Sequence, residues 1–151
     1  MLNYSDRPLL ARKLRETKDC FVRALAVSAK IPYAEAHRIA AVEFERHNRQ
    51  GTINIPYTLN QVSTRNRLAH AGLDIQPIDH TYKRNGKYFP LNIRRFYTKY
   101  NRGSYLILVS GHALAIIDGQ VQDWEAAAKH IGRTVIAAYR VSNGRQLELF
   151  N

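Results

Sequence analysis

Residues 104–124 read SYLILVSGHALAIIDGQVQDW, and the pattern of this stretch is the clearest indication of the fold. Two apolar runs of strand length, 104–110 and 112–117, are followed by a shorter run, 120–124. An Asp-Gly dipeptide separates the second run from the third and favours a two-residue hairpin turn. The stretch therefore predicts three consecutive antiparallel strands.

The Asp-Gly turn also sets which side chains share a face of the sheet. In that register Leu114 lies opposite Asp123, and because side chains alternate along a strand, His112 shares their face. His112 and Asp123 are then diagonal neighbours, about 7 Å apart between backbones. A carboxylate there can accept the imidazole N–H, fix the tautomer and support a positive charge on the ring. Ordinary polar residues at strand edges give the same pattern, and a one-residue change of register would separate the pair.

Two helices are expected well upstream of these strands. Residues 19–31, DCFVRALAVSAKI, predict a helix with Asp19 as N-cap, and its apolar residues on nearly all sides are typical of the middle of a fold. Residues 32–48, PYAEAHRIAAVEFERHN, predict a second helix with Pro32 in its first turn. The side chains expected on its buried face are Ala36, Ile39, Ala40, Phe44 and His47.

The rest of the chain completes the expected order of elements. Residues 58–72, TLNQVSTRNRLAHAG, predict a third helix that is capped by Thr58 and stopped by Gly72. A short helix over 125–132 and a last strand over 134–141 are expected after the hairpin. The residues expected on the buried side of the third helix are Leu59, Val62, Leu68 and Ala69.

Helices first and antiparallel strands afterwards define an α+β fold. With 151 residues the chain is expected to form a single domain, residues 1–151. We expect its helical part over about 8–75, a basic and aromatic connection over about 76–103, and its sheet part over about 104–142.

The composition narrows the setting in which the protein works. No apolar run approaches the roughly eighteen residues of a membrane span, and the N-terminal residues show no signal-peptide pattern, so no membrane partner is expected. A single cysteine excludes an intrachain disulfide and favours a reducing compartment, so we expect a cytoplasmic protein. The net charge of +11 favours polyanions or an acidic protein as partners, although a merely basic surface would give the same count.

The one cysteine, Cys20, directly follows the predicted cap Asp19 and therefore lies in the first turn of the buried helix. Unpaired amides and the helix dipole at that position stabilise a thiolate, which is the reactive form, and the amides can also stabilise an oxyanion. The carboxylate of Asp19 would disfavour the thiolate unless it points outward to cap the helix. As an alternative, a lone cysteine can be a small buried apolar residue.

Two segments, DCFVRALAVSAKIPYAEAH (19–37) and GSYLILVSGHALAIIDGQVQDW (103–124), together resemble the papain-like cysteine peptidase superfamily. The likeness is closest to its compact bacterial and phage members and extends more distantly to the double-glycine-leader peptidases. The resemblance implies N-terminal helices with a buried central helix packed on a C-terminal antiparallel sheet. It implies neither a cofactor nor a metal.

The resemblance also implies roles for three residues, which keep the order Cys, His, Asp along the chain. Cys20 would be the nucleophile, His112 the general base and then the acid for the leaving amine, and Asp123 the group that orients His112. Many relatives carry glutamine or asparagine shortly before the cysteine as an oxyanion donor, whereas the preceding ARKLRETKD contains neither. The backbone amide of Cys20, helped by Thr17 or Lys18, would then stabilise the oxyanion.

These roles predict a cysteine hydrolase that cleaves a peptide or isopeptide bond of a protein or peptide substrate through a thioester. Transglutaminases and arylamine acetyltransferases use the same trio on related folds, so transfer to an amine is an open alternative. Another alternative is a catalytically weak papain-like scaffold, such as a phage-type effector, that binds nucleic acid or a host protein through its basic surface. A phage-encoded protein of this kind would act in the host-cell cytoplasm.

A basic and aromatic segment carries the binding alternative, since no acidic residue stands between Asp79 and Asp118. Cations interleaved with aromatic rings can bind phosphates and stack on bases, or recruit an acidic protein. The plainer alternative is that the rings pack inward and the cations form a solvated face. The cations are Lys83, Arg84, Lys87, Arg94, Arg95, Lys99 and Arg102, and the aromatic residues are Tyr82, Tyr88, Phe89, Phe96, Tyr97, Tyr100 and Tyr105.

Overall fold

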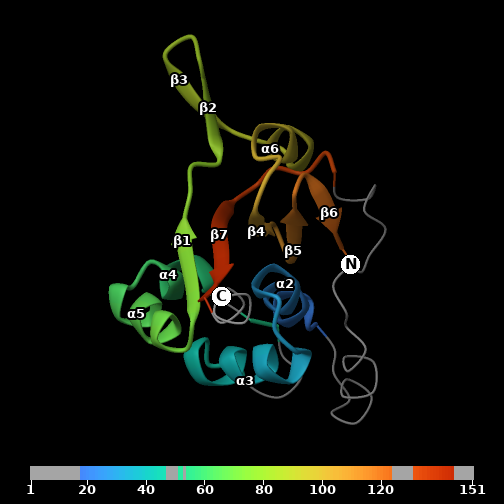
Figure 1. Cartoon of the computed structure of the whole chain (residues 1–151). Coiled ribbons are helices and arrows are strands. Elements are labelled where there is room, and N and C mark those ends of the chain that lie inside the picture. The colour runs from blue at the N-terminus through green and yellow to red at the C-terminus, as the bar shows by residue number, and fades with distance from the viewer. Residues whose placement is uncertain (1–17, 47–50, 53, 124–130, 145–151) are drawn as a thin grey trace.

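The computed structural model describes residues 18–46, 51, 52, 54–123 and 131–144, and Figure 1 shows the elements that they form. The described helices are α2 (Cys20–Ala29), α3 (Tyr33–Glu43), α4 (Ile55–Leu59), α5 (Val62–His70) and α6 (Ile93–Lys99). The described strands are β1 (Leu73–Pro77), β2 (Thr81–Arg84), β3 (Lys87–Pro90), β4 (Ser104–Val109), β5 (His112–Ile117), β6 (Gln120–Gln122) and β7 (Ala137–Asn143). Helices in the N-terminal half and an antiparallel sheet confirm the predicted α+β class.

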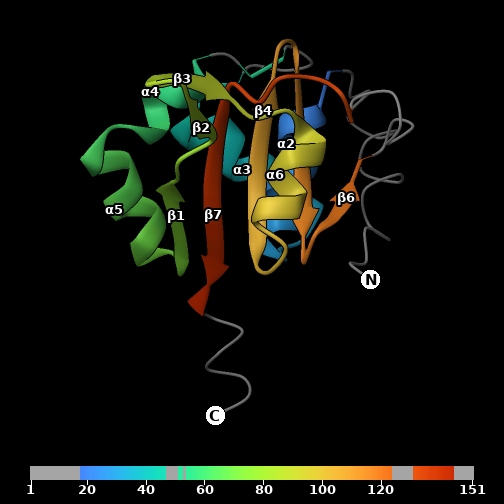
Figure 2. The same ribbon diagram turned by 90° about the horizontal axis from the view of Figure 1, so that it is seen from above.

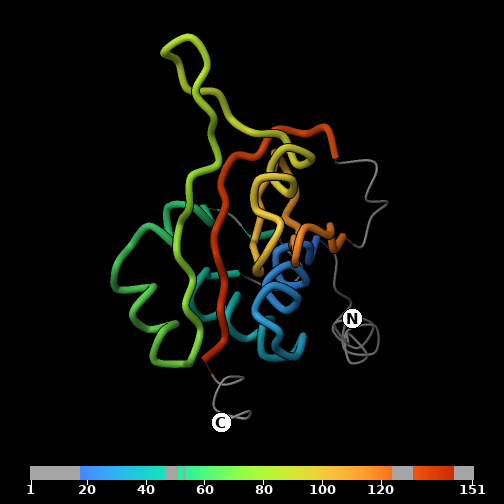
Figure 3. The backbone as a smooth tube through the Cα atoms, turned by 45° about the horizontal axis from the view of Figure 1, so that its top comes forward, coloured from blue at the N-terminus to red at the C-terminus, as the bar shows by residue number. Residues whose placement is uncertain are grey.

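The main sheet has five strands in the order β1-β7-β4-β5-β6, and all neighbouring strands are antiparallel. The predicted run of three consecutive strands is confirmed, because Ile117 pairs with Gln120 across the turn. Asp118 and Gly119 both have positive φ angles, 49° and 77°, as a type I′ turn requires. β7 lies between β1 and β4, so the last described strand is an inner strand of the sheet, next to the β1 edge (Figure 3).

The sheet contains a strand that the sequence analysis missed. The predicted helical part extended to about residue 75 and the sheet part began at about 104, but Leu73–Pro77 is an edge strand of the sheet. It pairs with β7 from Leu73 opposite Asn143 to Pro77 opposite Tyr139. Only two of its residues are buried, Leu73 and Ile75, and two apolar positions are too few to reveal a strand period.

Helices cover both faces of the central strands, with α2 on one face and α6 on the other (Figure 2). The side chains of β4 alternate between these faces. Leu106 and Leu108 pack in the core beneath α2, whereas Ile107 and Val109 pack in the core beneath α6. This two-sided cover explains why all six residues of β4 are buried.

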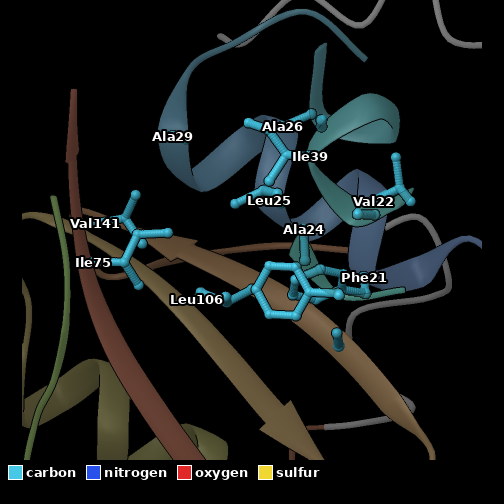
Figure 4. Close-up of a cluster of buried hydrophobic side chains, with 14 of the residues drawn as sticks. Phe21, Val22, Ala24, Leu25, Ala26, Ala29, Ile39, Ile75, Leu106 and Val141 are labelled. Carbon is cyan, nitrogen blue, oxygen red and sulfur yellow. The ribbon is translucent and has the colours of Figure 1, made fainter. Parts of the chain in front are cut away.

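The predicted central helix is confirmed. α2 packs against α3 on one side and against β4, β5 and β7 on the other, and Figure 4 shows Leu25 of α2 close to Ile39 of α3. Full burial of a leucine contributes about 1.5–3 kcal/mol, so a helix with eight buried residues is held firmly in place. No helix in the described part of the chain is both long and apolar enough to cross a membrane.

The second helix is confirmed over Tyr33–Glu43 but ends before the predicted residue 48, because Phe44 is its C-cap and Glu45 has a positive φ angle of 53°. The third helix is wrong as a single element. The buried face of α3 is confirmed, and His47 and the helix expected over 125–132 lie wholly or mostly outside the described residues. Residues 58–72 instead contribute to two short helices, α4 and α5, because Gln61 is extended (φ −78°, ψ 125°). Thr58 lies inside α4 rather than at a cap. Leu59 and Leu68 are buried as predicted, but Val62 and Ala69 are exposed.

The segment over 76–103, expected only as a connection, contains regular structure. β2 and β3 form a separate two-stranded hairpin that projects from the rest of the protein (Figure 1). Asn85 and Gly86, with φ angles of 50° and 76°, form its turn. The aromatic residues divide between inside and outside, since Phe96 and Tyr105 are buried while Tyr88 and Phe89 are exposed.

Candidate active site

The first residue of β5, His112, contacts Asp123, which directly follows β6. The distance between His112 Nε2 and Asp123 Oδ1 is 3.0 Å, and these side chains are 6% and 0% exposed. The last pair of the two strands is Ala115 with Gln122, so Asp123 stands one position beyond it, as the Asp-Gly turn predicted. The expected contact between the imidazole and the carboxylate is therefore confirmed.

The first residue of α2, Cys20, is the other hydrogen-bond partner of the His112 side chain. Because Nε2 of the imidazole faces Asp123, Nδ1 is the ring nitrogen that remains for the thiol. The packing of α2 against β5 produces this contact, since each element places its first residue at the same end of the pair. The structure thus brings together the three residues that the sequence analysis selected.

The charge state of His112 follows from its surroundings. Burial by itself lowers the pKa of His112, but the hydrogen bonds and negative charges of Asp123 and Cys20 outweigh burial and raise the pKa to about 9. The imidazole is therefore positively charged at neutral pH. An imidazolium beside a cysteine favours the thiolate, which is the nucleophilic form.

Asp19 occupies the N-cap position of α2, but its side chain makes no capping hydrogen bond. The condition under which Asp19 would not oppose the thiolate, an outward-pointing and capping side chain, is not met, because Asp19 is only 5% exposed. Its carboxylate accepts a 2.8 Å hydrogen bond from the Tyr33 hydroxyl and pairs with Arg23 Nε at 3.1 Å. These two partners compensate the negative charge of Asp19, so it opposes a thiolate on Cys20 less than a lone carboxylate would.

A cleft with a volume of about 720 Å³ opens beside the Cys20 and His112 side chains. It lies between the start of α2, the loop that leads into α4 and the β4–β5 connection. Its walls are mostly apolar, which suits a peptide side chain better than a highly charged ligand. Its lining residues include Lys18, Phe21, Asn54, Ile55, Leu108 and Ile136.

Polar groups that could face an oxyanion come from the start of α2 and from the loop before α4, where Thr52 and Asn54 line the cleft. The backbone N–H of Cys20 belongs to the first turn of α2, where amides have no partner within the helix. Lys18 lines the cleft, whereas Thr17 lies outside the described residues. Asn54 also lines the cleft, and the sequence analysis did not select it. Its left-handed conformation (φ 55°, ψ 34°) at the N-cap of α4 is one that asparagine tolerates, but the sequence alone does not show which side chains it faces.

The structure separates the seven cations of the basic segment. Arg102 lies in the connection before β4, where the neighbouring Gly103 N–H donates to Asp118 Oδ1, so Arg102 belongs with the β5–β6 turn. Arg94 lies in the first turn of α6, with its backbone bonded to Ile131. The other five lie on the projecting hairpin itself or on α6. The two on α6 approach the strands or the base of the hairpin. We call this group the hairpin surface, and its cations are Lys83, Arg84, Lys87, Arg95 and Lys99.

No group of three or more histidine, cysteine, aspartate or glutamate side chains in the described ranges is placed to hold a metal ion. No protein-family model matches this chain, and no curated protein or solved structure matches it either. The case for a function therefore depends on the geometry of Cys20, His112 and Asp123 and on the cleft beside them.

Proposed function

We propose that this protein is a papain-like cysteine hydrolase that cleaves a peptide or isopeptide bond through a thioester on Cys20. The observation that carries the proposal is the hydrogen-bonded order Cys20, His112, Asp123 at the mouth of an open cleft. Three residues from three separate elements meet there, and their order matches the nucleophile, base and orienting group of acyl transfer.

The raised pKa of His112 supports the first chemical step. With the proton already on the imidazole, the Cys20 sulfur attacks the substrate carbonyl carbon as a thiolate and forms the new C–S bond. The carbonyl oxygen becomes an oxyanion, to which the Cys20 backbone N–H at the head of α2 can donate. Lys18, Thr52 and Asn54 are other described polar side chains of the wall that can donate to it.

Proton transfer by His112 completes the reaction. The imidazolium gives its proton to the leaving nitrogen, the C–N bond breaks, and the acyl group stays on Cys20 as a thioester. The neutral imidazole then takes a proton from water, whose oxygen attacks the thioester and releases the acid and the thiolate. The Asp123 carboxylate holds the ring in place through Nε2 in both steps.

The apolar cleft wall indicates the kind of substrate. Phe21, Ile55 and Leu108 line the cleft, and Ile136 is 51% exposed at its edge. An exposed isoleucine is stabilised when an apolar group covers it. We therefore expect a substrate with an apolar side chain close to the scissile carbonyl.

The experiment that tests the proposal combines turnover with thiol labelling. A mixed peptide library is incubated with the wild-type protein and with Cys20→Ala and His112→Ala, and cleavage products are identified by mass spectrometry. Because Cys20 is the only cysteine, iodoacetamide labelling reports on this site alone. We expect cleavage only by the wild type, and labelling at pH 6 that is at least about tenfold slower in His112→Ala. Cleavage by Cys20→Ala would reject the mechanism.

A further inference from the structure

We propose that the hairpin surface binds single-stranded nucleic acid, with phosphates on its cations and bases against its exposed aromatic rings. This binding is separate from the hydrolase, because none of the residues that line the cleft comes from the segment 76–103. The shape of the hairpin, its exposed rings and the distribution of charge around it support this binding.

The pairing of β2 with β3 places cations and rings on the same face. Tyr82 is opposite Phe89, and Arg84 is opposite Lys87. Since side chains alternate along each strand, these four share one face of the hairpin, while Lys83 and its partner Tyr88 share the other. Each face therefore presents at least one aromatic ring next to at least one cation.

The exposed rings do not contribute to the hydrophobic cores. All four residues of β3 are exposed, and the exposed fractions of Tyr88 and Phe89 are 68% and 40%. Phe89 lies 5.8 Å from the ring of Tyr82, which is half-buried and packs against the core beneath α6, so the exposed ring continues an apolar platform from the core onto the hairpin. A platform of this kind can stack on any base, because every base has a π-face.

Cations stand directly over these rings. Arg95 of α6 lies 4.8 Å from the centre of the Tyr82 ring, and Lys83 lies 5.7 Å from that of Tyr88. This arrangement places positive charge within reach of the phosphates that flank a stacked base. An acidic protein would be attracted by the same cations, but its carboxylates would not contact the exposed ring of Phe89, whereas a base would stack on it.

The acidic residue nearest to the hairpin in the sequence is Asp79, at its base, and it is already bound. Its Oδ1 accepts hydrogen bonds from the Thr81 backbone (2.9 Å) and hydroxyl (2.7 Å), and these bonds, together with nearby Lys99, lower the pKa of Asp79. From His80 to Ile117 the chain has no other carboxylate side chain. The positive charge of the hairpin is therefore left for an external polyanion.

The hairpin leaves the sheet at the same end of the strands at which the cleft opens. Ile78, just after β1, donates its backbone N–H to Ala138, and the neighbouring Ile136 donates to Leu108 on the cleft wall. Nucleic acid on the hairpin would therefore lie near the cleft without filling it. For this reason we expect binding to be unaffected by alkylation of Cys20.

The test is fluorescence anisotropy with a labelled twenty-nucleotide oligothymidylate, using the full chain at 50 and 200 mM NaCl. Five phosphate contacts predict that this increase in salt weakens binding about a hundredfold, from a single-strand slope of about 0.7 per contact. Arg84→Ala/Lys87→Ala should weaken binding at 50 mM salt at least about tenfold and reduce the salt slope by about 1.4. Arg38→Ala/Arg102→Ala removes the same charge from two other exposed positions, one on α3 and one before β4, and should change binding less than about threefold.

Phe89→Ala tests the stacking part, and binding should weaken about tenfold. The affected side chains are exposed, so circular dichroism should show unchanged folding in all variants. Four results would each overturn the proposal: no binding by the wild type at 50 mM salt, equal losses in the two double variants, unchanged binding by Phe89→Ala, or tighter binding of the same-length duplex. Tighter binding of a polyglutamate peptide would also overturn it and identify an acidic protein as the partner.

Discussion

The Nε2 atom of His112 lies 3.0 Å from Oδ1 of Asp123, and both side chains are almost completely buried. The carboxylate holds one side of the ring, so the other nitrogen can face only a narrow region, and Cys20 occupies it. Each of these contacts can be tested by substitution, as can the contact of Tyr33 with Asp19 behind Cys20 and the position of Asn54 on the cleft wall.

Asp123→Asn keeps the shape of the side chain and removes its charge. Because the charge and hydrogen bond of Asp123 raise the pKa of His112, we expect that pKa to fall towards its ordinary value of 6.5 in the variant. The imidazolium needed by the leaving group is then scarce above neutral pH, and turnover should fall by about 10²–10⁴-fold. NMR titration of the ring and a pH–rate profile measure the two effects. An unchanged His112 titration in Asp123→Asn would contradict the assigned role.

The raised pKa of His112 also predicts a pH dependence of stability. A histidine whose pKa is about 9 when folded and 6.5 when unfolded stabilises the fold fully below pH 6.5, and the contribution is lost as pH rises through 9. The difference corresponds to at most about 3 kcal/mol. Urea unfolding at pH 6, 8 and 10 should show a steeper loss for the wild type than for His112→Gln. Parallel curves for the two proteins would exclude this linkage.

Tyr33→Phe tests the buried network behind the nucleophile. The variant removes the hydroxyl that donates to Asp19 at 2.8 Å and leaves the packing of the ring intact. Loss of a hydrogen bond to a buried carboxylate should destabilise the protein by about 1–3 kcal/mol, measured by urea unfolding. It should also slow iodoacetamide labelling at pH 6, because the Asp19 charge is then less compensated.

Asp19→Asn distinguishes the effect of the Asp19 charge on Cys20 from the effect of the network on the packing of α2. It removes the carboxylate itself, so labelling of Cys20 should not slow as it does in Tyr33→Phe. If both variants slow labelling equally, the network acts only by holding the start of α2, and the electrostatic explanation fails.

Asn54 is expected to assist the oxyanion from the cleft wall. Asn54→Asp keeps the shape but replaces the amide donor by a charge, and turnover should fall by about a hundredfold or more, with little change in KM. Asn54→Gly is the matched control for the backbone, because glycine adopts the left-handed conformation freely. It should lose activity similarly. A fully active Asn54→Gly would show that only the backbone conformation matters.

The sequence by itself determined the local parts of this protein. The Asp118–Gly119 turn fixed the register that places Asp123 beside His112, because a two-residue turn leaves one pairing. The apolar residues of α2 likewise determined that Cys20 begins a buried helix. Both inferences depend on neighbours within about a dozen residues.

The contacts between distant segments could not be predicted from the sequence and are seen only in the tertiary structure. Cys20 meets His112 because α2 packs on β5, and β7 enters the sheet between β1 and β4. The sequence also did not show which rings of the basic segment face inward. Phe96 is buried and Phe89 is exposed. These features depend on which apolar surfaces cover one another, and burial is a non-directional force that a local pattern does not specify.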